Sequence, residues 1–548
     1  MDKKTEEREI IRLHGEYLSA DEQRTAGKAL RESVPRASHG GWDAPKDRRD
    51  PIDILNASNE GRLPQLIPIR FGRMSQSPFA FYRGAAAIMA ADLASTPQSG
   101  LRVQACGDAH LMNFGGFATP ERNIIFDIND FDETLPGPWE WDIKRLAASV
   151  VIAAHHLRLA DRDAAKAATD TVCSYRERMI DYAAMRALDV WYDFIDVDRI
   201  ASILEEAGTE KDRKEVERKI KQAQKKSTPE ILFPKLAEHL GAMPTIKDEP
   251  PLIFHPTVEQ APGLKSGYRE PIAQYRETLP EHVRVLFDRF HFRDLAFRAV
   301  GVGSVGTMCA IALFMAGDDD PLFLQIKEAK ASVLEPYVGK SLHKNNGQRV
   351  VAGQHLMQSA SDMFLGWWRS PNGRDHYMRQ LRDTKVSPVI EDWDFKTLRA
   401  YGRLCAWALA RAHARSGDSA KIAGYMGSNS SFDDAVGEFA VEYADQNRRD
   451  HRAFIKAVRE GRIKGHHRGL SPTGVEDEQA STPSAPSCEV LQGRSIHRGS
   501  RAPSKQARTE GGGSDAAYNA VRGSCPGPGI GLSRAANDGN TFCAAALG

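Results

Sequence analysis

The sequence has little of what marks secreted, membrane-spanning or nucleic-acid-binding proteins. Its seven cysteines form no CxxC pair and no zinc-type spacing, which argues against a disulfide framework or a zinc site and fits a reducing compartment. It has no apolar run of about 18 residues, and its charged N-terminus has no apolar signal segment. The 74 basic and 73 acidic residues leave a net charge of +1, so electrostatics favour neither nucleic acid nor an anionic membrane as partner. We therefore expect a cytoplasmic protein.

The chain does have enough apolar sequence to bury two or three cores. It is 548 residues long, 41% hydrophobic and 27% charged. We predict an α+β protein with a polar N-terminal extension over 1–60, a helical part over 61–290, a β-rich part over 291–390 and further helices over 391–465. Ser, Gly, Pro, Ala and Arg then dominate, which predicts a disordered tail over 466–548.

The most informative stretch runs from Cys106 to Asp142 and threads acidic residues through apolar ones. The apolar residues of Ile124–Ile128 predict a short strand that delivers Asp130 into a turn. A Gly-Asp-x-His-x-x-Asn loop beginning at Gly107 lies close by in the sequence. Carboxylate and amide oxygens are the ligands that Mg²⁺ prefers, so this pattern predicts a metal–phosphate site. The alternative is a set of turn and capping residues, which Asp and Asn also favour.

A second informative stretch carries the pattern GxGxxG. Its glycines are Gly301, Gly303 and Gly306. Two apolar runs follow, at 308–315 and 322–326, separated by a turn and ending at Lys327; this predicts a β-hairpin that presents a lysine, as in kinases. A dinucleotide site would instead need a helix after the glycines and an acid about 20 residues on. That alternative stays open, because an aspartate triplet in the turn lies within reach of this offset.

Several long motifs resemble a known bacterial family. CGDAHLMNFGGF, FDINDFDETLPGPWEWDIKRLAAS, KEAKASVLE, GQRVVAGQ and ALARAHARSGD together resemble the domain-of-unknown-function family 2252 (DUF2252), over roughly residues 60–465. That family brings no established activity. A more distant resemblance brings chemistry: Gly107–Asn113 is similar to the HGDxHxxN catalytic loop of aminoglycoside- and choline-type phosphotransferases, with Cys106 in place of the first histidine. Asn129–Asp132 resembles their metal-binding strand end.

The resemblance implies a protein-kinase-like, two-lobed fold that binds ATP and Mg²⁺. Asp108 would orient or deprotonate the acceptor, and Asn113 and Asp130 would hold the metal. Asp132 and Asp127 are candidates for a further metal ligand. The group transferred would be a phosphoryl or nucleotidyl group, and the acceptor a small molecule or a protein.

The resemblance also implies how the nucleotide phosphates would be bound. Lys327 would pair with them, while the glycines would let backbone N–H groups approach. Glu335 is our candidate for the acid that positions Lys327, with Glu328 as the rival. The glycines and the lysine follow the catalytic loop in the sequence, the reverse of the order in ordinary kinases. A circular permutation is therefore implied, in which a helix over 398–414 would precede the catalytic loop in space.

Two further hypotheses remain open. Because Cys106 replaces the histidine of the catalytic loop, the protein could be a catalytically silent nucleotide-binding module. A dinucleotide-dependent oxidoreductase is the less favoured alternative, and a β-hairpin at 308–326 would exclude it. The kinase-like hypothesis depends on Lys327 and Asp130 lying together in one site.

Overall fold

The computed structural model describes most of the chain between residues 18 and 463. The described residues are 18–206, 214, 218, 229–240, 243–256, 269–299, 301, 305–317, 320–381, 385–386, 389–391 and 393–463. The tail over 466–548 and Gly303 lie outside them. Within the described residues, no helix combines the length and apolarity that a membrane span requires.

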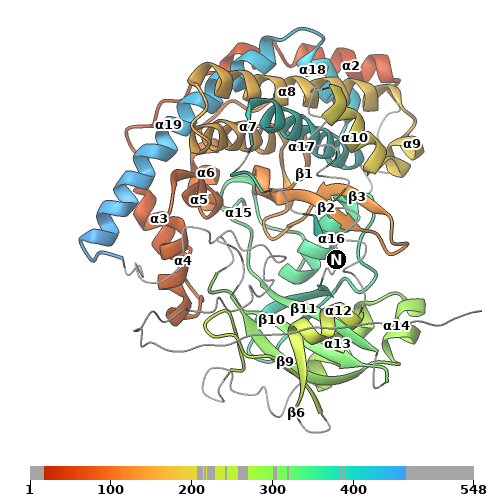
Figure 1. Ribbon diagram of the computed structural model, residues 1–548. Coiled ribbons are helices and arrows are strands. Elements are labelled where there is room, and N and C mark those ends of the chain that lie inside the picture. The colour runs from red at the N-terminus through yellow and green to blue at the C-terminus, as the bar shows by residue number, and fades with distance from the viewer. Residues whose placement is uncertain are drawn as a thin grey trace, which may run out of the picture. The chain divides into compact units, whose positions relative to one another are not determined.

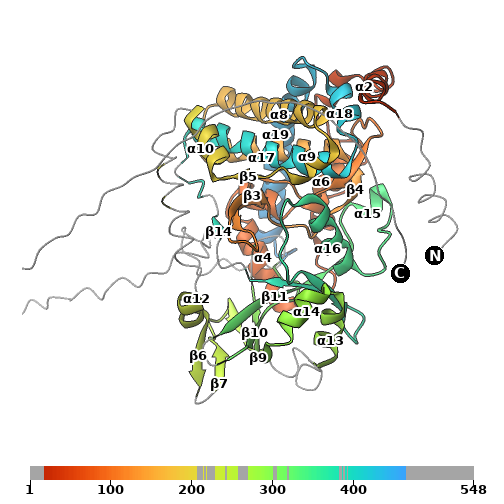
Figure 2. The same ribbon diagram turned by 90° about the vertical axis from the view of Figure 1, so that its right-hand side faces the viewer.

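The chain alternates between helical and β-rich segments (Figures 1 and 2). The helices are α2 Ala20–Ala29, α3 Pro51–Ala57, α4 Ile67–Met74, α5 Pro78–Arg83, α6 Ala86–Leu93, α7 Trp139–His156, α8 Asp161–Ala184, α9 Ala187–Tyr192, α10 Val197–Glu206, α12 Pro229–Leu236, α13 Arg269–Thr278, α14 Glu281–Phe287, α15 Glu335–Val338, α16 Asn346–Met357, α17 Phe395–Ser416, α18 Ser419–Met426 and α19 Ser431–Arg459, with 3-10 turns η1 Arg36–His39, η2 Pro64–Leu66 and η3 Leu111–Asn113. The strands are β1 Arg102–Ala105, β2 Phe114–Ala118, β3 Ile124–Ile128, β4 Leu135–Pro138, β5 Ile195–Asp196, β6 Ala237–Leu240, β7 Met243–Ile246, β8 Ile253–Phe254, β9 His291–Arg298, β10 Cys309–Met315, β11 Pro321–Ala329, β12 Gly366–Arg369, β13 Asp375–Gln380 and β14 Lys385–Val386. The mixed α+β class is therefore confirmed.

Long helices form the larger core. Helix α7 is buried along nearly its whole length, as expected for a helix that is apolar on several faces. It packs with α8, α17 and α19, which gather in the upper part of Figure 1. The helix predicted over 398–414 is confirmed as α17. It begins after Asp394, whose side chain caps the helix by accepting from the Thr397 N–H.

The C-terminal end of α17 lies against β1, the strand that leads into the acidic loop. Gly417, just beyond the helix, approaches β1 so closely that a Cβ would lie 2.7 Å from a methyl carbon of Val103. The Ser416 hydroxyl accepts from the Gln104 N–H at 3.1 Å. The C-terminal end of α17 therefore contacts β1, although Ser416 and Gln104 are 312 residues apart in the sequence.

The β-rich segment forms a six-stranded antiparallel sheet in the order β12-β13-β11-β10-β9-β8. Strands β10 and β11 pair from Cys309↔Lys327 to Met315↔Pro321, so the predicted hairpin is confirmed. The segment after Gly306 is thus a strand and not a helix. This topology excludes the dinucleotide-binding alternative, which requires a helix whose N-terminus faces the glycines.

A second sheet, of four strands in the order β14-β2-β3-β5, carries the acidic loop. The strand predicted over Ile124–Ile128 is confirmed as β3, and it is buried from end to end. The segment 81–93 is divided between two helices, because α5 ends at Arg83 and α6 begins at Ala86. The break is at Gly84, whose carbonyl accepts from Arg70 and whose close contact with Met74 leaves no room for a Cβ.

Candidate active site

One buried carboxylate accepts hydrogen bonds from the backbone of the loop that follows β1. Asp142, in the first turn of α7, accepts from the N–H groups of Cys106 at 2.6 Å and Gly107 at 2.9 Å. Gly107 has a φ of +79°, and a Cβ there would lie 2.5 Å from the carbonyl oxygen of Glu133, so glycine is required. On its other side Asp142 contacts His413 at 3.2 Å. Asp142 therefore braces the loop through hydrogen bonds to its backbone.

Asp108 lies next on this loop and pairs with an arginine that the sequence did not single out. Arg145, on α7, donates from Nε to Asp108 at 2.7 Å, and its guanidinium lies over the Tyr82 ring at 4.5 Å from the centroid. Burial raises the pKa of Asp108 to about 7, although Arg145 acts in the opposite direction. The Asp108 side chain still keeps 24% of its exposure. It is therefore reachable and changes protonation near neutral pH, as a general base must.

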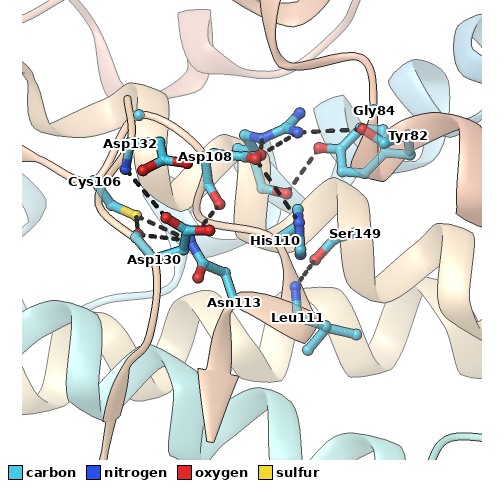
Figure 3. Close-up of polar contacts among 12 residues, drawn as sticks. Tyr82, Gly84, Cys106, Asp108, His110, Leu111, Asn113, Asp130, Asp132 and Ser149 are labelled. Atoms are coloured by element: carbon cyan, nitrogen blue, oxygen red, sulfur yellow. Dashed lines mark hydrogen bonds and ion pairs between the residues drawn. The ribbon is translucent and has the colours of Figure 1, made fainter. Parts of the chain in front are cut away.

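Asn113 connects this loop to the end of β3 (Figure 3). Its Nδ2 donates to the carbonyl oxygens of Asp108 at 3.1 Å and Asp130 at 3.0 Å, and it lies 3.5 Å from the Cys106 sulfur. These contacts fix the amide so that its nitrogen faces the backbone. Among the described residues, no donor hydrogen-bonds to the amide oxygen, so this oxygen is available to a ligand.

Lys327 meets the aspartates at the end of β3. Its Nζ lies 3.2 Å from both carboxylate oxygens of Asp130 and 2.8 Å from Asp132, and Tyr377 donates to the other oxygen of Asp132 at 2.6 Å. The Lys327 side chain is 4% exposed, whereas that of Asp130 is 40% exposed. The two segments expected to share a site therefore do so, with the lysine enclosed and the Asp130 carboxylate open to solvent.

Mutual charge overrides burial in this cluster. Burial would lower the pKa of Lys327, but Asp130 and Asp132 hold it well above its ordinary value. Burial would raise the pKa of Asp130, but Lys327 and Arg379 lower it to about 2. The lysine is therefore cationic and Asp130 anionic throughout the neutral range.

The acids expected to position Lys327 do not contact it. Glu335 is the first residue of α15, and the preceding Ser332 donates from its hydroxyl to the Glu133 carbonyl at 2.7 Å. Glu328 follows Lys327 on β11 and so points to the opposite face of the sheet, where it lies 3.3 Å from Arg374. Among the described residues, the carboxylates in contact with Lys327 are instead those of Asp130 and Asp132.

Asp127 is also placed differently from our expectation. It is fully buried, and its carboxylate receives hydrogen bonds from Arg411 at 2.6 Å and from the Ser359 N–H and hydroxyl at 3.0 Å each. Because these donors enclose it, Asp127 serves the structure and not a metal ion.

The glycine loop is tied down by the segment around η2 and α4. Gly301 and Gly306 both have positive φ values, +69° and +92°, which explains the choice of glycine at these two positions. Arg73 donates to the Gly301 carbonyl, and Arg62 donates to the Val305 carbonyl at 2.6 Å. Leu63 donates to the Gly306 carbonyl at 2.7 Å. The third predicted glycine, Gly303, lies outside the described residues.

Arg349, on α16, is another residue that sequence analysis missed. It donates to the carbonyl oxygens of Thr134 at 2.6 Å, Asp132 at 2.8 Å and Lys330 at 2.7 Å. It therefore joins the acidic loop to the segment that follows the lysine strand. The available signal was its place within the GQRVVAGQ motif, but a single arginine on a helix does not reveal which carbonyls it will reach.

The donor set suits a magnesium ion that arrives with phosphate. Among the described residues, no group of three or more His, Cys, Asp and Glu side chains converges to hold a metal on its own. Mg²⁺ usually takes only one or two protein carboxylates, together with waters and substrate phosphates. The exposed carboxylate of Asp130 fits that requirement, and the Lys327 ammonium lies 3.2 Å from it.

Fold and site together define a mixed α+β protein in which a buried lysine from an antiparallel sheet meets two aspartates at the end of a strand. The family described as "Uncharacterized protein conserved in bacteria (DUF2252)" matches residues 62–457. The chain therefore belongs to this bacterial family. No curated protein and no solved structure matches the chain.

Proposed function

We propose that this protein is an ATP- and Mg²⁺-dependent phosphotransferase acting on a small-molecule or protein acceptor. The observation that carries the proposal is the contact of Lys327 with Asp130 and Asp132, made between segments 195 and 197 residues apart in the sequence. Phosphoryl transfer requires a cation at the phosphates, hard oxygens for the metal and a group that orients the acceptor. Lys327, Asp130 with Asn113, and Asp108 supply these in one site.

In the proposed reaction, an acceptor hydroxyl attacks the γ-phosphorus of ATP. Its proton passes to Asp108 as the new O–P bond forms and the bond to the β-phosphate oxygen breaks, which releases ADP. Arg145 keeps the Asp108 carboxylate oriented, and Lys327 would offset the phosphate charge. When bound, Mg²⁺ supplies further neutralisation of that charge and would be held by Asp130 and Asn113.

We further propose a circularly permuted kinase-like fold. The contact between Ser416 and Gln104 supports it, since α17 ends where β1 leads into the acidic loop. The antiparallel hairpin that joins the glycines to Lys327 also supports it, because a kinase-type glycine loop lies between strands. The order of these parts in space is then that of a kinase, with the chain opened at a different point.

Calorimetric titration of ATP with Mg²⁺ tests the proposal. We expect the wild type to bind ATP in a Mg²⁺-dependent manner and Asp130→Asn to lose at least tenfold in affinity, because one hard anionic ligand is gone. Asp181→Asn, which removes a carboxylate that is half-exposed on α8, is the matched control and should bind as the wild type does. Absence of binding by the wild type, or unchanged Mg²⁺-dependent binding by Asp130→Asn, would contradict the proposal.

A catalytically silent nucleotide-binding module is the second candidate. The observation behind it is Cys106, whose buried thiol lies 3.5 Å from Asn113 Nδ2 and 3.7 Å from the Asp130 carbonyl. ATP consumption measured across a panel of hydroxyl and amine acceptors separates the two candidates. Tight ATP binding without turnover on any acceptor would favour the silent module.

A further inference from the structure

A cavity of about 580 Å³ lies on the far side of α16 from the lysine cluster. Its walls come from α9, α14, α16, the segment 358–365, β12 and the end of α17. It shares no lining residue with the lysine–aspartate cluster. Figure 2 shows α16 between α9 and α17 on one side and α14 on the other. Two tryptophans, Trp191 and Trp367, give the cavity flat apolar surfaces.

The cavity contains one guanidinium whose charge no carboxylate neutralises at close range. Arg415 donates from Nη1 to the Gln358 carbonyl at 2.5 Å, and its guanidinium lies 4.0 Å from the centroid of the Trp191 ring. Its Nε is enclosed by the protein, whereas its Nη2 is not enclosed and has no hydrogen-bond partner among the described residues. No carboxylate of the described residues lies within 4.0 Å of Arg415. The stacking on Trp191 and the hydrogen bond to Gln358 thus fix the guanidinium plane, while Nη2 has no acceptor among the described residues.

The other charged residue of the lining is already engaged. Asp362 accepts from the N–H groups of Phe364, at 2.9 Å, and Gln380. The cavity therefore offers one open cationic nitrogen, while both carboxylate oxygens of its aspartate already accept from backbone N–H groups. At its rim, Trp191 is 44% exposed and Met363 is also exposed, although large apolar side chains are usually covered.

We propose that this cavity binds a small organic anion with a flat apolar body. The anionic group, a carboxylate, sulfonate or phosphate, accepts from Nη2 of Arg415 in a charge-assisted hydrogen bond. The flat body covers the exposed faces of the tryptophans. The cavity is of the size that small-ligand sites occupy, and a ligand there would give Arg415 Nη2 the acceptor that the described residues do not provide.

Helix α16 separates this cavity from the lysine–aspartate cluster. Gln348, Ala352 and His355 line the cavity, at the one-turn spacing of a single helical face. Arg349 and Gly353 lie on the other face, against the 132–134 segment. An occupant of the cavity thus contacts the helix that holds the Asp132 carbonyl.

The proposal is tested on the full chain, without nucleotide, using 8-anilinonaphthalene-1-sulfonate as a fluorescent probe. We expect saturable binding that benzoate displaces and benzyl alcohol, its uncharged counterpart, does not. Arg415→Met should weaken binding about tenfold or more, since a charge-assisted hydrogen bond is lost. Arg178→Met is the matched control, because Arg178 also stacks on a tryptophan, Trp407, at 4.0 Å but lies outside the cavity.

A second variant keeps the charge and removes the space. Ala352→Phe fills the cavity from α16 and leaves Arg415 in place, so it should also abolish probe binding while thermal unfolding shows a folded protein. Wild-type protein that fails to bind the probe saturably overturns the proposal, as does retention of wild-type affinity by either variant. Because ATP is absent from every arm, the result is independent of whether the protein transfers phosphate.

Discussion

Two aspartates near the end of β3 each meet a basic side chain, and the two pairs differ in access to solvent. Asp127 and Arg411 are both 0% exposed and lie 2.6 Å apart. Asp130 is 40% exposed, although its partner Lys327 is enclosed. Burying an ion pair costs desolvation free energy, which hydrogen bonds to the carboxylate offset. Ser359 provides such hydrogen bonds to Asp127. In the half-exposed pair, the Asp130 carboxylate can bind a ligand in place of Lys327.

The first prediction concerns the buried pair. Asp127→Asn leaves the Arg411 charge without its counterion, and removing one member of such a pair costs about 3–5 kcal/mol. Urea unfolding should show this loss. Asp130→Asn, at the open pair, should change the free energy of unfolding by no more than about 1 kcal/mol. Equal losses in the two variants would show that both pairs are structural.

The second prediction concerns the partner exchange. Lys327→Met removes the cation that occupies Asp130 and Asp132, so the two carboxylates become available to a divalent ion. We expect Mn²⁺ to bind about tenfold more tightly in the absence of nucleotide, roughly 1.4 kcal/mol, while ATP binding is lost. Electron paramagnetic resonance of free Mn²⁺ measures the first effect. Lys327→Met combined with Asp130→Asn is the control and should lose the gain; a fall in Mn²⁺ affinity in the single variant would contradict the prediction.

The third prediction concerns Asp108, the acid of the site with a raised pKa. The base is the carboxylate form, so activity should rise with pH through about 7 in the wild type. Arg145→Gln removes the charge that favours the carboxylate, and the midpoint should move to higher pH by about one unit. A pH–rate profile of ATP consumption measures it. Arg145→Lys keeps the charge and should shift the midpoint less; a shift to lower pH would contradict the assigned role.

The smallest effect is expected at Glu335. Because Lys327 is positioned by Asp130 and Asp132, Glu335→Gln should leave ATP affinity and stability within experimental error of the wild type. Asp132→Asn, which breaks contacts to both Lys327 and Tyr377, should weaken ATP binding measurably in the same calorimetric assay. A strong effect of Glu335→Gln would restore Glu335 as the positioning acid.

Local sequence pattern was enough for the parts of the site that are local. The β10–β11 hairpin, strand β3 and helix α17 follow from apolar periodicity and turn residues, and their bounds are nearly those expected. The position of Lys327 at the end of a hairpin follows from the same pattern. Its meeting with Asp130 depended on the motif resemblance, because periodicity says nothing of contacts between distant segments.

The hydrogen-bond and ion-pair partners of the site residues could not be predicted from local sequence pattern. Arg145 and Tyr377 are held to Asp108 and Asp132 by tertiary packing, and neither lies in a motif that names its partner. Glu335 was chosen because it lies close to Lys327 in the sequence, but it does not contact Lys327 in the structure. Nothing in the sequence distinguishes Asp127 from Asp130 as a site residue. The difference comes from tertiary packing, in which Arg411 and Ser359 enclose Asp127.

The separation of 197 residues between Asp130 and Lys327 also bears on how the protein is made. A ribosome adding about 5–20 residues per second would release the aspartates roughly 10–40 seconds before the lysine that neutralises them. During that interval the acidic loop lacks the hydrogen bonds that Lys327 and Arg349 donate in the complete protein. Truncated nascent chains ending before residue 320 should therefore remain open to proteases at 106–142, and synthesis of β11 and α16 should be needed to close this loop.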